Sequence, residues 1–477
     1  MNPMNLLYII SDQHSYDAMG CYGSATVQTP NLDRLAERGT RFTNAYTNCP
    51  ICVPVRAALA TGRYVHQDGF WDNGHPYDGS IPSWHHYLRD QGVQVDSIGK
   101  LHFRSTDDDL GFTQSVEPLN VVAGVGDILG CIRDNPPLRQ KKDGILESGP
   151  GDSTYLQYDI RNAENGCRWL AQHANDEQPW VLFLSFVCPH PPYIAPPALY
   201  DAYPLDGIEM MPQWQQTEWP EHSAMAYFRH FFGLEEQFTE HEIRRMNAAY
   251  YGATTHLDQQ IGRVLNQLDE LGLTDKTRTI YTSDHGESRG ARGLFGKFTM
   301  YEESVGIPFI MAGPDVPEGK VCNTPVSLID SYPTIVDAVD MPVPEANLDG
   351  ESLWSIAAGP DQERLAFSEY HAVGSQHASF MVTDGHHKYI HYVNSVPQLF
   401  DLHTDPKELN DLSQSQPEVA ASFEQKLRTI LDPDAVDAQA KADQRSKVDA
   451  FGGEEAVRSR GYFVNSPTPD EKPAFHQ

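Results

Sequence analysis

Short apolar runs recur along the first part of the chain and predict the strands of one sheet. They occupy residues 6–10, 93–98, 180–187, 279–283 and 308–311. The runs at 6–10 and 180–187 are apolar at almost every position, which is typical of strands covered on both faces, as in a parallel sheet between helices. The pattern therefore predicts an α/β fold with a large mixed, mostly parallel sheet that is flanked by helices.

A long helix is predicted between residues 240 and 271. Its apolar side chains recur at helical spacing, and they are Ile243, Met246, Tyr250, Ala253, Leu257, Ile261, Val264, Leu268 and Leu271. We interpret this stripe as core packing and not as a cofactor site. Shorter helices are predicted at 83–91 and 155–173. Residues 105–150 and 201–238 show no clear period, and we expect loops that shape or cover a pocket there.

From about residue 366 the pattern of apolar and polar positions changes to short alternating segments. Two alternating segments, 380–383 and 388–392, flank Asp384-Gly385, which is a strong hairpin signal. We therefore expect three units: a catalytic α/β domain at 1–365, a small antiparallel-sheet subdomain at 366–430, and a polar C-terminal tail at 431–477.

The charge balance is strongly acidic. Lys and Arg total 35 against 66 Asp and Glu, a formal net charge of −31. The average field of such a chain repels nucleic acid and highly sulfated polymers, so we expect a small substrate and no nucleic-acid partner. Solubility in a salty environment explains the acidity equally well.

The sequence gives no sign of a membrane-spanning segment or of an oxidising compartment. No apolar run approaches the roughly 20 residues that span a bilayer, and residues 1–5 lack a basic stretch. The seven cysteines form no matched Cys-x-x-Cys pairs, which fits a reducing compartment; they are Cys21, Cys49, Cys52, Cys131, Cys167, Cys188 and Cys322. We expect a cytoplasmic protein without a membrane partner.

Cys52 is the centre of the predicted chemistry. Pro54 suits the first turn of a helix and Gly62 suits its end, so Cys52 is expected at a helix N-terminus. Unpaired N–H groups and the positive end of the helix dipole favour an anion there, and Arg56 adds a fixed positive charge. A lone cysteine is more often a buried structural thiol, so this pattern needs further support.

The arrangement of Cys52, Pro54 and Arg56 before Thr61-Gly62-Arg63 resembles the signature of the type I sulfatases, members of the alkaline phosphatase superfamily. The resemblance implies an alkaline-phosphatase-like fold. It also implies that a formylglycine-generating enzyme oxidises Cys52 to formylglycine, whose hydrated aldehyde is the nucleophile. Further motifs follow in the order of the family, which favours this interpretation over a structural thiol.

A metal site is expected at two strand ends. Asp12-Gln13 follows the first strand and Asp284-His285 a later one, and carboxyl ends of parallel strands share one edge. The resemblance implies one divalent cation held by these four residues and an oxygen of formylglycine-52. Gln13 and His285 depart from the usual Asp-Asp and Asp-Asn and are similar to choline-sulfatase-like and phosphonate-monoester-hydrolase-like members. Oxygen-rich ligands favour calcium, and the imidazole makes manganese the alternative.

The resemblance also implies a set of groups around the sulfate. Lys100 and His102 lie two residues apart after a strand and would point the same way from an extended segment. The implied sulfate-contacting residues are Arg56, Lys100, His102, His190 and Lys297, with Asn73 facing the substrate. His102 is the expected general acid and His190 the alternative.

The expected reaction is hydrolysis of a sulfate ester. The nearest rival is a phosphonate monoester or phosphodiester hydrolase with the same nucleophile, but such relatives have tyrosine and threonine at the positions of Lys100 and His102. A scaffold without activity would have lost Cys52 or a metal ligand, and none is lost. The polar tail is expected either to be disordered or to wrap a neighbouring subunit, as C-terminal extensions do in choline-sulfatase-like oligomers, and a homo-oligomer is expected. The identity of the alcohol stays open.

Overall fold

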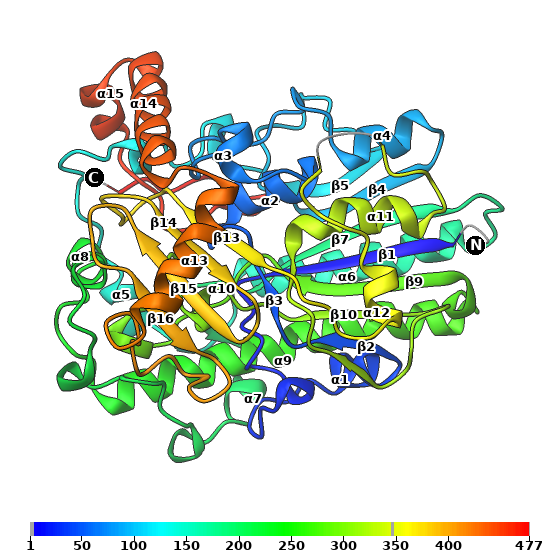
Figure 1. The fold of residues 1–477 in the computed structure, drawn as a ribbon. Helices are drawn as coiled ribbons and strands as arrows, with labels where there is room; N and C mark the ends of the chain where they lie inside the picture. Colours follow the sequence, from blue (N-terminus) through cyan, green and yellow to red (C-terminus); the bar gives the residue numbers. More distant parts are fainter. Residues whose placement is uncertain (1–3, 345–347, 477) are drawn as a thin grey trace.

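The computed structural model describes residues 4–344 and 348–476. Its main sheet has eight strands in the order β11-β2-β10-β9-β1-β7-β4-β5 (Figure 1). The bounds are β1 Asn5–Asp12, β2 Gly39–Phe42, β4 Gln94–Lys100, β5 Gln114–Leu119, β7 Trp180–Pro189, β9 Thr277–Ser283, β10 Phe309–Ala312 and β11 Lys320–Cys322. Within this sheet β10 runs antiparallel to both of its neighbours, and the other pairings are parallel. The predicted large, mostly parallel sheet is confirmed.

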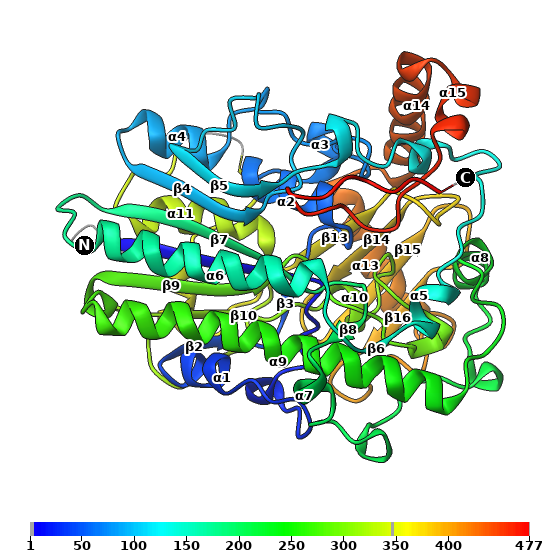
Figure 2. The ribbon, with the colours of Figure 1, turned by 180° about the vertical axis from the view of Figure 1, so that it is seen from behind.

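Helices cover both faces of this sheet. On one face lie α6 (Thr154–His173) and α9 (Glu240–Glu270), which are in front in Figure 2. On the other lie α2 (Cys52–Thr61), α4 (Trp84–Asp90) and α11 (Ser331–Ala338), seen in Figure 1. Side chains of the central strand β1 alternate between the two faces of the sheet. Leu6, Tyr8 and Ile10 pack into the core on one face, and Leu7 and Ile9 pack into the core on the other. This explains why β1 is apolar at successive positions.

Two segments expected to be loops contain regular structure. Residues 105–150 include the edge strand β5, which pairs in parallel with β4, and the short helix α5 (Lys142–Leu146). Residues 201–238 include α8 (Ser223–Phe231). The expectation of loops was wrong at β5 because an edge strand is half exposed and has no continuous apolar run, and Pro118 argued against a strand.

The small C-terminal sheet has the order β13-β14-β15-β16 and is antiparallel. Its strands are β13 Ala366–Tyr370, β14 Ser379–Thr383, β15 His387–Tyr392 and β16 Gln398–Asp401, and α13 (Pro417–Ile430) covers β14 and β15. The predicted hairpin is confirmed, since Thr383 pairs with Lys388 across Asp384-Gly385. Buried Glu369 of β13 accepts hydrogen bonds from the backbone and side chain of His66, in the short helix α3 (Val65–Asp68).

The last part of the chain packs on earlier parts of its own chain. It contains α14 (Pro433–Phe451) and α15 (Glu454–Arg460), followed by residues 461–476 without a helix. Gln444 of α14 donates to Asp72 Oδ2 at 2.7 Å. In Figure 2 the final dark red segment turns back from α15 towards α2. Of the helices in the described ranges, none is both long and apolar enough to cross a membrane.

Candidate active site

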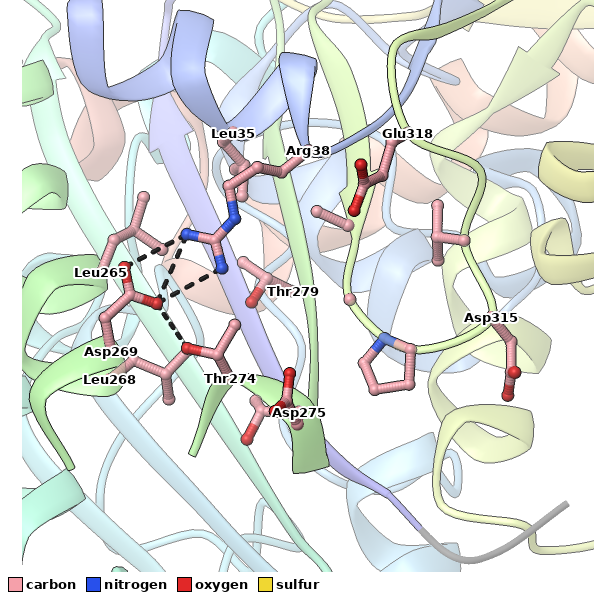
Figure 3. Close-up of a pocket in the computed structure, with 15 residues that line it drawn as sticks. Leu35, Arg38, Leu265, Leu268, Asp269, Thr274, Asp275, Thr279, Asp315 and Glu318 are labelled. Carbon is pink, nitrogen blue, oxygen red and sulfur yellow. Dashed lines mark hydrogen bonds and ion pairs between the residues drawn. The ribbon is translucent and has the colours of Figure 1, made fainter. Parts of the chain in front are cut away.

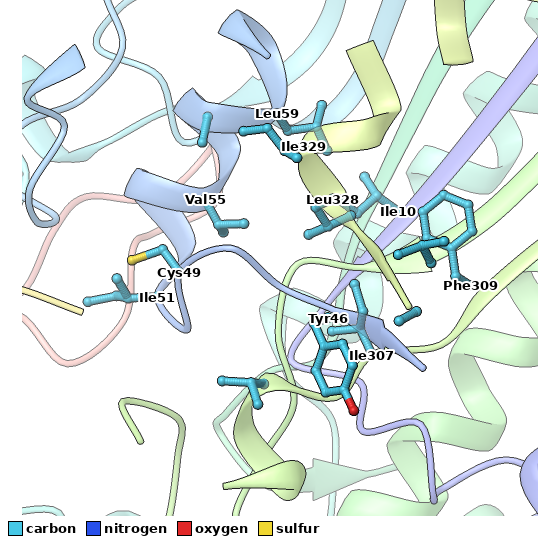
Figure 4. Packing of buried hydrophobic residues seen from close by; sticks show 14 of the residues in the cluster. Ile10, Tyr46, Cys49, Ile51, Val55, Leu59, Ile307, Phe309, Leu328 and Ile329 are labelled. Carbon is cyan, nitrogen blue, oxygen red and sulfur yellow. The ribbon is translucent and has the colours of Figure 1, made fainter. Parts of the chain in front are cut away.

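Helix α2 presents Cys52 at its N-terminus. The helix begins at Cys52 after Ile51, whose backbone is extended, and ends at Gly62, whose φ of 71° is left-handed. Every residue of α2 is buried. Figure 4 shows Val55 and Leu59 on the inner side of the helix, packed beside Leu328 and Ile329. This packing holds the helix, and with it Cys52, in a fixed position; the predicted helix start is confirmed.

Cys52 lies among charged and polar groups. Its Sγ is 3.1 Å from Nε2 of His285, 3.1 Å from Nζ of Lys297 and 3.6 Å from Oδ1 of Asp12. Burial raises the pKa of the thiol to about 11, Asp12 adds to this effect, and Lys297 opposes it. Cysteine nucleophiles act as thiolates, whose formation needs a lowered pKa, so the unmodified thiol is poorly suited to attack at neutral pH.

Four buried residues form a cluster that can hold a metal ion. One ligand atom each from Asp12, Cys52, Asp284 and His285 lies within 4.8 Å of all the others. Asp12 ends β1 and Asp284 directly follows β9, and these strands are neighbours in register, with Ser11 opposite Ser283. The sheet therefore brings together two carboxylates that are far apart in the sequence.

The contacts of His285 favour a neutral imidazole whose Nε2 can bind a metal ion. Its Nδ1 lies 3.1 Å from the carbonyl oxygen of Gly286, which can only accept, so the proton is on Nδ1. Nε2 then offers a lone pair, 3.6 Å from Asp12 Oδ1 and 3.5 Å from Asp284 Oδ1. Burial lowers the pKa of His285 to about 4, which keeps the imidazole neutral. Two carboxylates and a neutral imidazole are a fitting donor set for a divalent cation.

Gln13 lies beside this cluster in a left-handed backbone conformation, with φ 69°. Its N–H donates to Asp284 Oδ1 at 3.1 Å, and its Oε1 accepts from Lys297 Nζ at 2.7 Å. Its Nε2 donates to Glu287, a buried carboxylate that also accepts from Tyr193. The sequence interpretation assigned no role to Glu287, although it lies only two residues after His285; its contact with Nε2 orients the Gln13 side chain.

Three buried cations surround the cluster. Arg56 Nε donates to Asp284 Oδ2 at 3.0 Å, and its Nη1 donates to Lys100 O and Ser185 Oγ. Lys100 forms an ion pair with Asp12, and Lys297 contacts Cys52 as described above. Burial alone would raise the pKa of Asp12, but the positive charge of Lys100 holds it well below its usual range. Asp12 is therefore ionised, as a carboxylate that holds a metal ion must be.

Lys100 and His102 do not leave an extended segment side by side, so that expectation was wrong. Lys100 ends β4, but the chain turns at His102, where φ is 56°. As a result Lys100 faces Asp12, whereas His102 Nε2 lies 2.8 Å from Ser466 Oγ in the C-terminal segment. Burial and the charge of Lys100 lower the pKa of His102 well below its usual value. No motif marks Ser466, and the sequence interpretation missed it.

His190 and Asn73 have their own contacts. His190 Nδ1 lies 2.8 Å from the carbonyl oxygen of Pro191, and its ring meets Tyr155 edge to face. Asn73 Oδ1 accepts from the N–H of Val53 at 3.2 Å. Asn73 thus binds the first turn of α2, next to Cys52, and its oxygen is already engaged there.

A cavity of about 410 Å³ lies elsewhere on the molecule (Figure 3). It is lined by Arg38, which pairs with Asp269, and by Thr277, the first residue of β9. Asp284 follows the last residue of β9, so this cavity is at the opposite edge of the sheet. It takes no part in the cluster around Cys52.

A cysteine at a helix start, beside a cluster that can hold a metal ion and at the carboxyl edge of such a sheet, is the arrangement expected of a hydrolase of the alkaline phosphatase superfamily. Residues 4–341 match the Sulfatase family, and residues 290–432 match the family described as N-sulphoglucosamine sulphohydrolase, C-terminal. The chain belongs to the sulfatase family: it is a type I sulfatase, and therefore a sulfuric ester hydrolase.

Curated relatives agree with this assignment, and a solved structure agrees with the fold. Arylsulfatase K of Bos taurus is 31% identical over 465 residues, which cover 91% of this chain and 83% of the relative. Choline-sulfatase of Rhizobium meliloti (strain 1021) is 28% identical over 497 residues, which cover 98% and 94%. The phosphonate monoester hydrolase of Agrobacterium radiobacter shares the fold, with a TM-score of 0.73 and 24% identity over 92% of this chain and 96% of its own.

Proposed function

We propose that the protein hydrolyses the sulfate ester of a small alcohol, with Cys52 matured to formylglycine and one divalent cation bound beside it. The observation that carries this proposal is the convergence on Cys52 of His285 and Lys297, both 3.1 Å from its sulfur. The cation would be held by Asp12, Asp284 and His285, with Gln13 and an oxygen of residue 52 completing the set. Calcium is our first choice and manganese the alternative.

Formylglycine supplies a geminal diol, of which one oxygen attacks sulfur and the other expels the sulfate on return to the aldehyde. A divalent cation held by Asp12, Asp284 and His285 would supply positive charge beside residue 52 and the sulfate oxygens. Lys297 is placed to stabilise negative charge at residue 52, because its Nζ already contacts that side chain. Arg56 is engaged with Asp284, Lys100 and Ser185, so we assign it chiefly to hold Asp284.

The leaving oxygen gains negative charge as the ester bond breaks and needs a proton. We assign this proton to His102, which is buried near Lys100 and held by Ser466. His190 is the alternative. Lys100 pairs with Asp12 here, and a cation bound by Asp12 would compete for that carboxylate and free the ammonium group to grip the sulfate.

A second candidate function is hydrolysis of a phosphonate monoester or phosphodiester, because one neighbour of the same fold is named a phosphonate monoester hydrolase. Phosphoryl transfer would use the same nucleophile and cation. We rank it second because Lys100 and His102 stand where such relatives have tyrosine and threonine. Promiscuity between the two reactions is expected, since both place negative charge on equatorial oxygens.

The experiment is expression with and without a formylglycine-generating enzyme, followed by peptide mass spectrometry, metal analysis and sulfate release from a panel of small sulfate esters. We expect activity to scale with the fraction of residue 52 converted to formylglycine. Full activity in a preparation that contains only unmodified Cys52 would refute the mechanism. A matured, metal-loaded preparation active on phosphonates and inactive on every sulfate ester would favour the second candidate.

We propose three partners: the maturation enzyme, a small sulfate ester and a second copy of the chain. A cytoplasmic location is also proposed, on the ground that all seven cysteines are free. Light scattering tests the oligomer, and cell fractionation tests the location.

A further inference from the structure

Lys141 carries a charge for which the described part of the chain offers no ion pair. Its half-buried side chain lies over two aromatic rings, with Nζ 4.4 Å from the centroid of Phe232 and 4.1 Å from that of Phe298. The next residue differs: Lys142 is exposed and pairs with Glu236 at 2.9 Å. Ring faces attract an ammonium group, but they do not neutralise it.

This ammonium group is next to the reaction site. A Cβ built on Gly296 would lie 2.7 Å from Lys141 Nζ, so the lysine packs directly against the backbone before Lys297. Lys297 in turn contacts both Cys52 and Gln13. The Lys141 ammonium group therefore lies against Gly296, and the next residue, Lys297, contacts Cys52.

The carboxylate that acts on Lys141, Glu287, is occupied by other donors. Its Oε1 accepts from the N–H groups of Arg289 and Gly296, and its Oε2 accepts from Tyr193 and Gln13. Burial lowers the pKa of Lys141 to about 7, and Glu287 offsets this effect only in part. Near neutral pH this amine is therefore only partly protonated, and an anion that binds beside it would favour the charged form.

Building on the proposed function, we propose that Lys141 forms a second anion subsite beside the sulfate site, so that the preferred alcohol carries a further anionic group, either a carboxylate or a second sulfate. Phe232 and Phe298, whose rings stack with centroids 5.1 Å apart, are buried and would hold the Lys141 ammonium group in place from one side. The net charge of −31 disfavours long polyanions, so the substrate is a small molecule with about two negative groups. A cationic alcohol such as choline would meet an uncompensated positive charge.

The test compares substrates that differ in their second group: phenyl sulfate, carboxyphenyl sulfates, benzenediol bis-sulfates and choline sulfate. For each we measure kcat/KM of the matured wild type and of Lys141→Met, which keeps the aliphatic stem over the rings. The ratio of kcat/KM for a doubly anionic ester to that for phenyl sulfate is expected to fall roughly 10- to 100-fold in Lys141→Met. Lys141→Arg should keep most of the ratio, and the matched control Lys142→Met should keep all of it. The carboxyphenyl and bis-sulfate arms identify the anionic group.

An unchanged ratio in Lys141→Met, or a wild type that prefers choline sulfate, would overturn the subsite. Calorimetry with the same esters on Cys52→Ala protein, with and without Lys141→Met, separates the two proposals. If the doubly anionic esters bind more tightly through Lys141 but no sulfate ester is turned over by matured enzyme, the subsite stands and the proposed function fails. If sulfate esters are turned over but neither binding nor kcat/KM depends on Lys141, the proposed function stands and the subsite fails.

Discussion

Ser466 Oγ lies 2.8 Å from Nε2 of His102, which joins the last segment of the chain to the end of β4 across 364 residues. The backbone carbonyl of Ser466 is itself held by the hydroxyl of Tyr155, so the serine has a fixed position. Nδ1 of His102 is buried, and no described group bonds to it. When the Ser466 hydroxyl donates to Nε2, the imidazole proton resides on Nδ1, the nitrogen that is free to meet a leaving group.

Replacement of Ser466 by alanine is therefore expected to impair proton transfer. We expect kcat for esters of poor leaving groups to fall about 3- to 30-fold, because the imidazole loses the partner that selects its tautomer, with a smaller effect for nitrophenyl leaving groups. The measurement is a series of aryl and alkyl sulfates. Ser446→Ala, at an exposed serine of α14, is the control. An equal loss for good and poor leaving groups would remove Ser466 from the proton path.

Asp284→Asn is expected to cost both metal and rate. The substitution keeps the shape of the side chain but removes one of two carboxylates, and it leaves Arg56 with only its longer ion pair, 3.9 Å to Asp12. We expect metal content to fall well below one ion per chain and kcat/KM to fall at least about 1000-fold. A chelator should lower the Tm of the wild type and leave that of the variant unchanged. Full metal occupancy with normal turnover would exclude Asp284 as a ligand.

The choice between sulfate and phosphonate chemistry is expected to depend on Lys100 and His102. Changing Lys100 to Tyr and His102 to Thr together should lower kcat/KM for sulfate esters by about two to three orders of magnitude. Phosphonate or phosphodiester hydrolysis should fall less. The ratio of the two kcat/KM values is the quantity to measure, because incomplete maturation cancels in it. An unchanged ratio would show that these residues do not serve the leaving group.

Stability is expected to depend on pH through Asp159 of α6. This buried carboxylate accepts from the N–H groups of Val187 and Cys188, and burial raises its pKa to about 7. The folded state therefore binds the proton more tightly than the unfolded state does, and stability falls as pH rises from about 4 to about 7. Asp159→Asn removes this titration, so its Tm relative to the wild type should rise by a few °C between pH 5 and pH 8. The same Tm difference at both pH values would contradict the assignment.

Much of the fold and part of the site could be predicted from local patterns. Cys52 was expected at a helix start because Pro54 and Gly62 act within a few residues, and α2 begins and ends accordingly. Asp12 and Asp284 were placed at strand ends because each follows an apolar run, and neighbouring strands bring them together. These inferences succeeded because propensity and burial pattern are encoded over short stretches of chain.

Other features were decided by contacts between distant segments. The edge strand β5 has little apolar signal of its own and exists because β4 offers it a row of backbone partners. The left-handed turn at His102 depends on the path of the chain after β4. Ser466 contacts His102 because α14 and α15 return the last segment of the chain to the end of β4. Lys141 looks like any lysine in an irregular stretch until Phe232, Phe298 and Gly296 surround it. The local sequence determines the propensity of a segment to form a helix or a strand. The packing of the whole chain determines which groups contact a half-buried side chain, and those contacts set the charge and the geometry of the site.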